Sequence, residues 1–339
     1  MRFTVFKNIN GDKFKMKCTK AVYFSLVCLA GCIQVALAQS AAGYPNKPIK
    51  IVVSFTAGGT TDILAREVGN QMSIRWKVPV IVENKPGAAG NLGTEIVGRA
   101  APDGYTLLAS SIGPISINPT LFGSLPVNPQ KALQPVALLG DVPNILAVPA
   151  SSGIKTWKEF IAYLKANPGA INYGSTGIGT TAHLISYLFA QKVNVDATHI
   201  PYKGAEATRD LVAGRLQFMF ATAPSVVPLI KAGQLNAIAV SSKKRISAMP
   251  DLPTLNELGV DIATGAWFGF FAPTGTDPAI IKKLNETTLS ILEEPAIKQK
   301  LLGLGADPVP MNVQEFTKFV HNDYALWAPI VKASGAKPE

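Results

Sequence analysis

The sequence predicts an α/β protein of two lobes, and two observations carry this prediction. Short runs rich in valine, isoleucine and phenylalanine alternate with segments of helical period along almost the whole chain. Such alternation is typical of parallel sheets whose two faces are covered by helices. Roughly 300 residues follow an N-terminal export signal. Because this is too many for one ordinary core, two lobes of usual size are expected.

Residues 1–38 are predicted to be a secretory signal that is removed from the mature chain. Lys17 and Lys20 precede the apolar run AVYFSLVCLAGCIQVALA, which ends in small residues. This order of a charged region, an apolar region and small residues predicts export, with cleavage between Ala38 and Gln39.

Two alternatives concern the same segment. Translation can begin at Met16, and LAGC, which ends at Cys32, resembles a lipoprotein cleavage box, although the apolar sequence after it disfavours a lipid anchor. All three cysteines lie in this segment, with six of the 32 basic and one of the 22 acidic residues. The mature chain therefore needs no disulfide, and its formal charge falls from +10 to +5. A mildly basic surface without a lysine or arginine cluster predicts no nucleic-acid partner.

Nine strands are predicted in order along the chain, each from a short run rich in valine, isoleucine or phenylalanine. They are 49–55, 78–83, 105–111, 144–150, 171–175, 197–202, 217–222, 236–242 and 267–273.

The segments between the strands have helical period, and several carry end signals. The predicted helices are 61–75, 91–100, 156–166, 180–192, 205–213, 225–232, 254–258, 278–302 and 313–333. Thr156 with Glu159, and Thr254 with Glu257, have the spacing of a capping box. The two C-terminal helices each carry one apolar stripe, so both are expected to pack on one lobe.

The stretch SFTAGGTTDILAR leads from strand 49–55 into helix 61–75. Gly58 and Gly59 let the main chain approach a ligand closely, and Thr60 or Thr61 can cap the helix. The free N–H groups and the dipole of the helix start favour an anion there. An ordinary tight turn, with Asp62 complementing the dipole, explains the same residues, so this stretch alone leaves both interpretations open.

The stretch NYGSTGIGTTAH, residues 172–183, repeats the design from strand through glycine, serine and threonine to helix. GIGTTA within it matches a loose dinucleotide-binding pattern, but that pattern belongs near the start of a βαβ unit, and Asp196 precedes the next strand. A phosphate-binding P-loop is excluded because no lysine follows the glycines. The loop is a second candidate anion site.

Residues suited to catalysis or metal binding are few. Ser175 lacks the G-x-S-x-G frame of a nucleophile elbow, because Tyr173 stands where the first glycine should be. The histidines are His183, His199 and His321, and no two have the spacing of metal ligands. His183 is expected to pack or to brace the second loop. We therefore expect no enzyme activity, no metal and no cofactor.

A third, more diffuse region follows the second loop. Tyr202 ends a predicted strand and Gly204 opens another turn, while Thr222, Trp267 and Phe268 lie near predicted sheet edges or crossings. Aromatic residues there can line a ligand site, but packing in the core is the simpler interpretation of each such residue by itself.

Segments in a fixed order over nearly all the mature sequence carry a family resemblance. They are YPNKPIKIVV, AGGTTDILAR, VENKPGAAGNLGTE, APDGYTLL, YGSTGIGTTAHL, IPYKGAEATRDLVAGRL, LIKAGQLNAIAVSS, MPDLPTLNELGV and WFGFFAPTGTDPAIIKKLN. Each alone is modestly specific, and all of them in this order are strongly so. Together they resemble the periplasmic solute receptors of tripartite tricarboxylate transporters, the Bug family.

The first loop departs from the usual form of that family. Related receptors carry prolines where this chain has Ser54, Thr56, Ala57 and Thr60. The loop is therefore expected to be less rigid and to offer additional hydroxyl groups, which affects the identity of the ligand more than its class.

The resemblance implies a type II periplasmic binding-protein fold, in which two α/β lobes are joined by crossing segments around a central cleft. Lobe 1 would comprise residues 39–142 plus 268–339, and lobe 2 residues 143–267. The two glycine–threonine loops would then face each other from opposite lobes. The ligand-binding residues would be Phe55, Ala57, Gly58, Gly59, Thr60, Thr61, Asp62, Ser175, Thr176, Gly177, Gly179, Thr180, Thr181 and Tyr202.

In these implied roles, residues 58–61 donate to one carboxylate and Asp62 braces their loop. Residues 175–181 receive the other polar end of the ligand, and Phe55 and Tyr202 flank its body. The protein would be a monomeric periplasmic receptor for a dicarboxylate, an aromatic carboxylate or an acidic amino acid, which it delivers to permease subunits in the membrane. A secreted hydrolase or transferase with an unrecognised site, and a sensor-coupled solute-binding protein, are the alternatives.

Overall fold

The computed structural model describes residues 43–334. The predicted signal at 1–38, with the alternatives at Met16 and Cys32, lies outside the described residues. The chain divides into a unit Met1–Asn46 and a compact unit Lys47–Glu339. All elements below belong to the second unit.

The strands and helices largely follow the predicted order. The strands are β1 (Ile49–Val53), β2 (Val80–Asn84), β3 (Thr106–Ser111), β4 (Leu133–Pro149), β5 (Asn172–Ser175), β6 (Thr198–Pro201), β7 (Met219–Thr222), β8 (Leu235–Val240) and β9 (Gly265–Pro273). The α-helices are α2 (Thr60–Trp76), α3 (Asn91–Gly98), α4 (Asn118–Leu121), α5 (Pro129–Ala132), α6 (Trp157–Ala166), α7 (Thr181–Lys192), α8 (Glu206–Val212), α9 (Ala223–Lys231), α10 (Pro278–Glu293), α11 (Pro295–Gly303) and α12 (Val313–Ser334). Three short turns of other helix types are Ala88–Gly90, Gly113–Ile117 and Ala150–Ser152.

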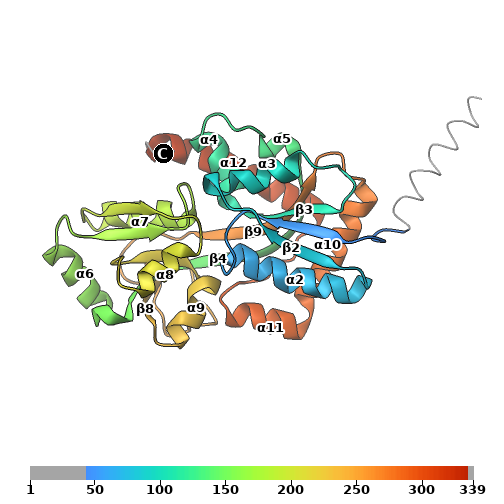
Figure 1. Cartoon of the computed structure of the whole chain (residues 1–339). Helices are drawn as coiled ribbons and strands as arrows, with labels where there is room; N and C mark the ends of the chain where they lie inside the picture. Colours follow the sequence, from blue (N-terminus) through green and yellow to red (C-terminus); the bar gives the residue numbers. More distant parts are fainter. Residues whose placement is uncertain (1–42, 335–339) are drawn as a thin grey trace, which may run out of the picture. The chain divides into compact units, whose positions relative to one another are not determined.

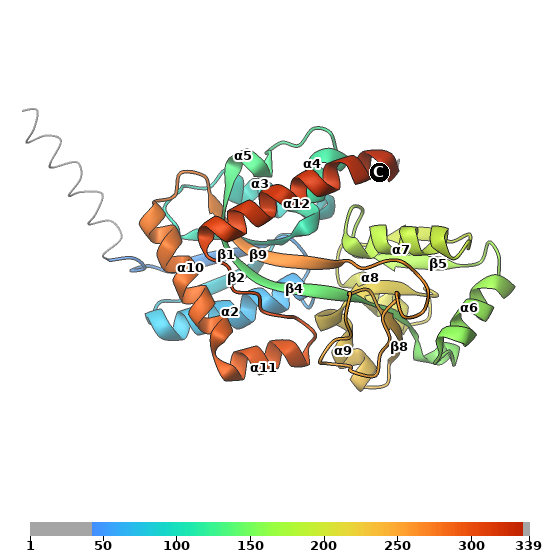
Figure 2. The same cartoon turned by 180° about the vertical axis from the view of Figure 1, so that it is seen from behind.

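The unit is an α/β structure of two lobes (Figures 1 and 2). Lobe 1 contains β1–β3, α2–α5 and α10–α12, and lobe 2 contains β5–β8 and α6–α9. The strands β4 and β9 lie side by side and connect the lobes. The predicted lobe boundaries, at 142/143 and 267/268, fall inside these two strands and stay a prediction.

The main sheet is mixed, whereas the alternation of strands and helices predicts parallel sheets. Its order is β2-β1-β3-β9-β4-β7, with β8 also paired to β4. β1 pairs in parallel with β2 and β3, but β9 is antiparallel to β3 and β4. The reason is that β4 leads the chain out of lobe 1 and β9 leads it back. At Asn144 the pairing of β4 changes from β9 to β7 and β8.

Two predicted helices differ in the structure. The segment 278–302 forms two helices, because Pro295 lacks an N–H and holds the preceding Glu294 in an extended conformation. The segment 254–258 is a series of turns, although Thr254 and Glu257 exchange the two hydrogen bonds of a capping box. Its first residues bond instead to β8, since the N–H of Leu255 donates to the carbonyl of Val240.

Buried aromatic rings hold the helices of each lobe to its strands. In lobe 2, Phe160 of α6 stacks on Phe189 of α7 with 6.0 Å between ring centroids, and Phe218 meets Phe160 edge-on at 5.7 Å. In lobe 1, Phe316 of α12 packs against Phe271 of β9 at 5.6 Å. Each such side chain contributes about 1.5–3 kcal/mol when fully buried.

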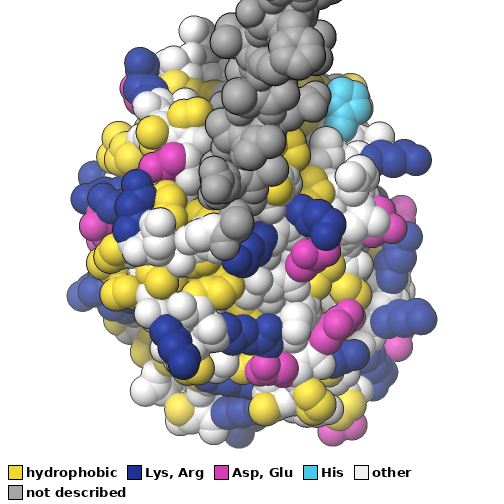
Figure 3. All heavy atoms as spheres, turned by 90° about the vertical axis from the view of Figure 1, so that its right-hand side faces the viewer, with side chains coloured by type: hydrophobic (Ala, Val, Ile, Leu, Met, Phe, Trp, Pro, Cys, Tyr) yellow, Lys and Arg dark blue, Asp and Glu magenta, His cyan; other side chains and the backbone are white. Residues whose placement is uncertain are grey.

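The surface of the unit is of mixed character. On the face shown in Figure 3, lysine and arginine side chains are interspersed with acidic and hydrophobic ones, and the described part of that face carries no continuous basic stripe. Within residues 43–334, none of the helices has the length and apolar character that crossing a membrane requires.

Candidate functional site

The first loop connects β1 to α2 and is held in shape by Asp62. The Asp62 carboxylate accepts hydrogen bonds from the Gly58 N–H at 3.0 Å, from Arg66 Nε at 2.9 Å and from Asn84 Nδ2 at 2.9 Å. Burial raises the pKa of Asp62, but these three hydrogen bonds and the Arg66 charge outweigh burial and hold the pKa below its ordinary value. The carboxylate is therefore ionised and faces its own loop.

The second loop, between β5 and α7, is held by its own hydroxyl groups and by a histidine. The Ser175 hydroxyl donates to the Gly177 carbonyl at 3.0 Å, and Thr180 Oγ1 donates to the same carbonyl at 2.7 Å. The Gly179 N–H donates to Nδ1 of His183 at 3.2 Å. This last bond confirms the expectation that His183 braces the loop.

The helices that follow both loops begin without a side-chain cap. Gly59 precedes α2 and Thr180 precedes α7, and neither start has a side-chain hydrogen bond to its N–H groups. The hydroxyl of Thr180 donates to the Gly177 carbonyl and makes no capping hydrogen bond to α7. The N–H groups of Thr60, Thr61 and Thr181 are therefore left for another acceptor, and the helix dipoles favour a negative one.

These starts meet at a cavity of about 50 Å³ that both lobes line. The lining residues are Phe55, Gly59, Thr60, Thr61, Ser111, Ile112, Gly113, Thr176, Thr180, Thr181, Gly204, Ala205, Thr208, Thr222, Ser225, Ala266 and Phe268. Hydroxyl groups dominate its polar surface, and none of these described residues has an acidic, basic or imidazole side chain. An anion in this cavity would be held by N–H and O–H donors alone.

The structure brings half of the predicted ligand-binding residues to this cavity. Phe55, Gly59, Thr60, Thr61, Thr176, Thr180 and Thr181 line it. Ala57, Gly58, Asp62, Ser175, Gly177, Gly179 and Tyr202 do not.

The second group has other partners. The N–H groups of Gly58, Gly177 and Gly179 donate to Asp62, Ser175 and His183. The Tyr202 hydroxyl donates to the Asp210 carboxylate on α8 at 2.8 Å. These residues shape the loops around the cavity without lining it.

Several lining residues were not expected from the sequence. Ser111 ends β3, whose parallel pairing with β1 brings the carboxyl ends of both strands to one sheet edge. The end of the predicted strand 105–111 could therefore have indicated Ser111 as a lining residue. Thr208 and Ser225 lie in the first turns of α8 and α9, where no sequence pattern marks them. Phe268 lines the cavity, whereas Trp267 packs in the lobe 1 core and donates from Nε1 to Asp323 at 3.0 Å.

One contact pairs a serine with a histidine, as the active site of a serine hydrolase does. Ser175 Oγ lies 2.7 Å from Nε2 of His199. The direction of this hydrogen bond depends on the histidine tautomer, and the Ser175 hydroxyl also lies 3.0 Å from the Gly177 carbonyl, to which it can donate instead. Ser175 is also fully buried and does not line the cavity. Among residues 43–334, no group of three or more acidic, histidine or cysteine side chains is arranged to hold a metal ion.

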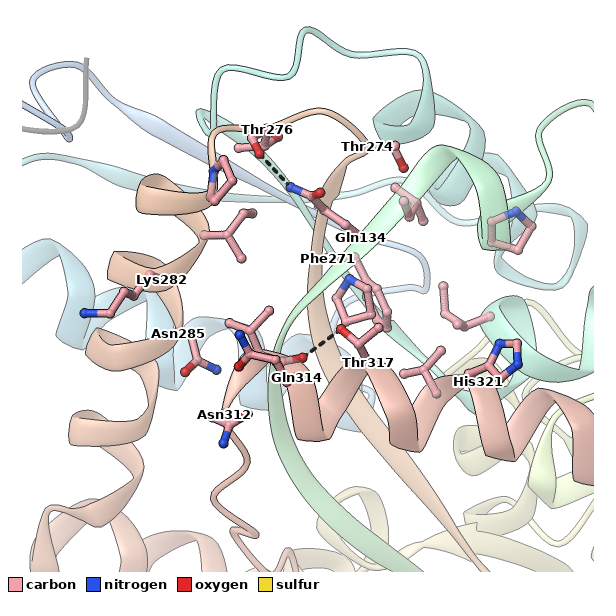
Figure 4. A pocket seen from close by; sticks show the side chains of 18 of the residues that line it. Gln134, Phe271, Thr274, Thr276, Lys282, Asn285, Asn312, Gln314, Thr317 and His321 are labelled. Atoms are coloured by element: carbon pink, nitrogen blue, oxygen red, sulfur yellow. Dashed lines mark hydrogen bonds between the residues drawn. The ribbon is translucent and has the colours of Figure 1, made fainter. Parts of the chain in front are cut away.

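A larger cavity, of about 820 Å³, lies in lobe 1 between α10, α12 and the first part of β4 (Figure 4). Lys282 of α10 and His321 of α12 stand on opposite sides of it. Two of its polar side chains bond to the main chain of lobe 1: Gln134 Nε2 donates to the Thr276 carbonyl at 3.0 Å, and Asn285 Nδ2 to the Val136 carbonyl at 2.8 Å. None of the predicted ligand-binding residues lines it, so the cavity between the lobes is the candidate site.

Comparison with known proteins agrees with this fold. BugT of Bordetella pertussis is 35% identical over 306 residues, which cover 89% of this chain and 94% of BugT. The structure of R. palustris Rpa4515 with adipate superposes with a TM-score of 0.84 at 32% identity, over 87% of this chain and all of that one. The structure of MatC (Rpa3494) from Rhodopseudomonas palustris with bound malate gives 0.78 at 31% identity, over 85% of this chain and all of that one.

The family assignment follows from these similarities and from a match over most of the chain. Residues 64–336 match the sequence profile of the tripartite tricarboxylate transporter family receptor. Members of this family are periplasmic solute-binding receptors rather than enzymes. The fold is accordingly the α/β periplasmic binding-protein fold, with two lobes around a central cleft. The chain belongs to the tripartite tricarboxylate transporter receptor family.

Proposed function

We propose that the protein is a periplasmic receptor that captures a small organic carboxylate between its lobes and delivers it to membrane permease subunits of a tripartite tricarboxylate transporter. One observation carries the proposal. The uncapped starts of α2 and α7, one from each lobe, meet at a single hydroxyl-lined cavity. Each offers main-chain donors and the positive end of a helix dipole to the same guest.

The absence of charged side chains from the lining residues supports a small anion held by directional donors. The adipate and malate bound by two structural relatives are carboxylates of this kind. The apolar walls, Phe55, Ile112 and Phe268, suit the carbon skeleton of such a molecule. Export through the predicted signal at 1–38 would place the receptor in the periplasm.

The first test identifies the ligand class. The mature chain is purified, examined by native mass spectrometry for a retained ligand, and screened by thermal shift against adipate, malate, succinate, benzoate and glutamate. A carboxylate at a hundred times its Kd adds about 2.7 kcal/mol of stability, a shift of several degrees in Tm. The matching diamides carry no charge and are expected to leave Tm unchanged.

The second test links binding to one donor. Thr181 is the first helical residue of α7, a position that proline favours although it lacks an N–H. Thr181→Pro and Thr181→Val both lose the hydroxyl, but only the proline variant loses the N–H. We expect Thr181→Pro to bind about tenfold to a hundredfold more weakly than Thr181→Val by calorimetry. Equal affinities in the two variants would remove α7 from the site, and turnover of any ester or amide in a substrate screen would favour the hydrolase.

A further inference from the structure

Thr56 belongs to the first loop of lobe 1, but its hydroxyl bonds to lobe 2. The N–H of Ala205 donates to Thr56 Oγ1 at 2.8 Å. Ala205 immediately precedes α8, and this helix start has no side-chain cap from its own segment. Thr56 therefore supplies, from the opposite lobe, an acceptor for the N–H of the residue that precedes α8, as the side chain of a first-turn glutamate does in a capping box.

The close approach of the two segments depends on Gly204. This residue has φ = +107°, and a Cβ atom there would lie 2.4 Å from Thr56 Oγ1 and 3.2 Å from the Thr56 nitrogen. Only glycine fits such a contact without displacing the loop of the other lobe. The two lobes thus meet main chain to main chain beside the cavity.

A second hydrogen bond crosses the cleft nearby. Thr60 Oγ1 lies 2.6 Å from Thr222 Oγ1, at the starts of α2 and α9. Thr60, Thr222, Gly204 and Ala205 all line the cavity, whereas Thr56 does not. Thr56 is therefore the member of this contact that can be changed without touching a group that faces a bound solute.

We propose that Thr56 is a positioning residue for solute binding, whose hydrogen bond to Ala205 holds the lobes in the closed arrangement. The bond joins two lobes, so it exists when they are together and is lost when they separate. Any interaction made in one of two conformations shifts the equilibrium toward that conformation. This inference rests on the proposed function, since closure matters only if the cleft retains a solute.

The experiment measures closure directly and needs no solute. Residues 39–339 contain no cysteine, so in a chain that starts at Gln39, Lys165→Cys on α6 and Lys298→Cys on α11, both exposed positions, accept a fluorescent pair that reports the distance between lobes. Thr56→Val keeps the side-chain shape and removes the acceptor, and Thr56→Ser restores it. Thr288→Val is the matched control, because Thr288 Oγ1 donates within α10 to the Leu284 carbonyl at 2.8 Å.

In solute-free buffer, Thr56→Val is expected to lower the ratio of closed to open molecules about fivefold, the usual effect of losing one intramolecular hydrogen bond. Thr56→Ser should match the wild type, and Thr288→Val should leave the ratio unchanged. The proposal is overturned if Thr56→Val has the wild-type ratio, if Thr56→Ser fails to restore it, if Thr288→Val shifts it equally, or if the wild type is wholly open. The carboxylate screen tests the proposed function separately, so failure of one leaves the other measurable.

Discussion

Two neutral histidines support the second loop. The rings of His183 and His199 stack with 4.0 Å between centroids and an interplanar angle of 12°. Burial lowers the pKa of His183 to about 4, and burial together with the adjacent His183 ring lowers the pKa of His199 to about 3. Both rings contact the loop that carries the start of α7, through Gly179 and Ser175. Protonation of His183 at Nδ1 would remove the acceptor of the Gly179 N–H.

These pKa shifts predict a loss of stability in mild acid. Both folded pKa values lie below the ordinary histidine value of about 6.5, so the unfolded chain binds more protons as the pH falls. The neutral histidines should contribute their full stabilisation above about pH 6.5, and the free energy of unfolding should fall as the pH is lowered toward 4. The fall is at most about 1.4 kcal/mol per pH unit for each ring. It should be smaller than this limit because both rings are partly exposed. Urea unfolding at pH 7.5, 6 and 5 measures this dependence.

The variant His199→Gln isolates the contribution of the histidine pair from that of the carboxylates. Asp62, for example, has a lowered pKa, and its contribution is lost at lower pH. The variant should show a shallower fall between pH 6.5 and 5 than the wild type. Identical pH profiles for the two proteins would contradict a buried neutral pair.

The sequence predicted which residues form the two loops more successfully than it predicted what each residue does. The glycine and threonine pattern after a strand located both loops, because turns and helix starts are determined by residues that are adjacent in the sequence. It assigned Gly58 and Gly179 to the ligand, whereas Asp62 and His183, which were expected to brace the loops, accept the hydrogen bonds of their N–H groups. Which N–H groups stay free depends on how side chains fold back on the loop, and that is a property of the folded structure.

At the scale of elements, Ser241 ties together the segments that meet between the lobes. Its hydroxyl accepts from the Asn144 N–H at 2.9 Å and donates to the Thr264 carbonyl at 2.6 Å. Asn144 is the residue at which β4 changes partners, and Thr264 immediately precedes β9. One fully buried hydroxyl therefore connects both crossing strands to the end of β8.

Ser241→Ala is expected to lower the free energy of unfolding by about 1–3 kcal/mol, because it leaves the buried Asn144 N–H and Thr264 carbonyl without this partner. The neighbouring Ser242→Ala provides a matched control. The Ser242 hydroxyl donates to the Lys244 carbonyl in an exposed turn, so its loss should change stability by less than about 0.5 kcal/mol. Equal effects in urea unfolding would show that Ser241 has no special role at the crossing.

The crossing strand β4 shows why some elements escaped prediction. Only 144–150 was predicted as a strand, whereas β4 begins at Leu133. Pro135 and Gly140 discourage a strand assignment locally. In the structure both lie at irregularities in the pairing with β9, and Gly140 lets the carbonyl of Asp307 approach. Pairing with a strand more than a hundred residues later overrides these local signals.

At the scale of the whole molecule, the charged side chains of the protein lie away from the cavity in which an anionic ligand would bind. The mature chain is expected to carry a formal charge of +5, yet the described cavity lining has no charged side chain. Its basic residues lie elsewhere, many in exposed ion pairs such as Lys282 with Glu286. Attraction of an anion to the surface and retention of that anion in the cleft should therefore respond differently to salt.

This separation predicts an affinity that depends little on ionic strength. The Debye length is about 8 Å at 0.15 M salt, so screening weakens interactions with surface charges far more than interactions with N–H and O–H donors inside a closed cavity. The Kd of the carboxylate found by thermal shift should change less than about threefold between 50 and 500 mM salt, measured by calorimetry. Sodium fluoride used beside sodium chloride separates screening from competition by chloride for the cavity. Weakening by more than tenfold in both salts would show that a lysine or arginine outside the lining residues holds the ligand, and that the helix starts are not its main source of positive potential.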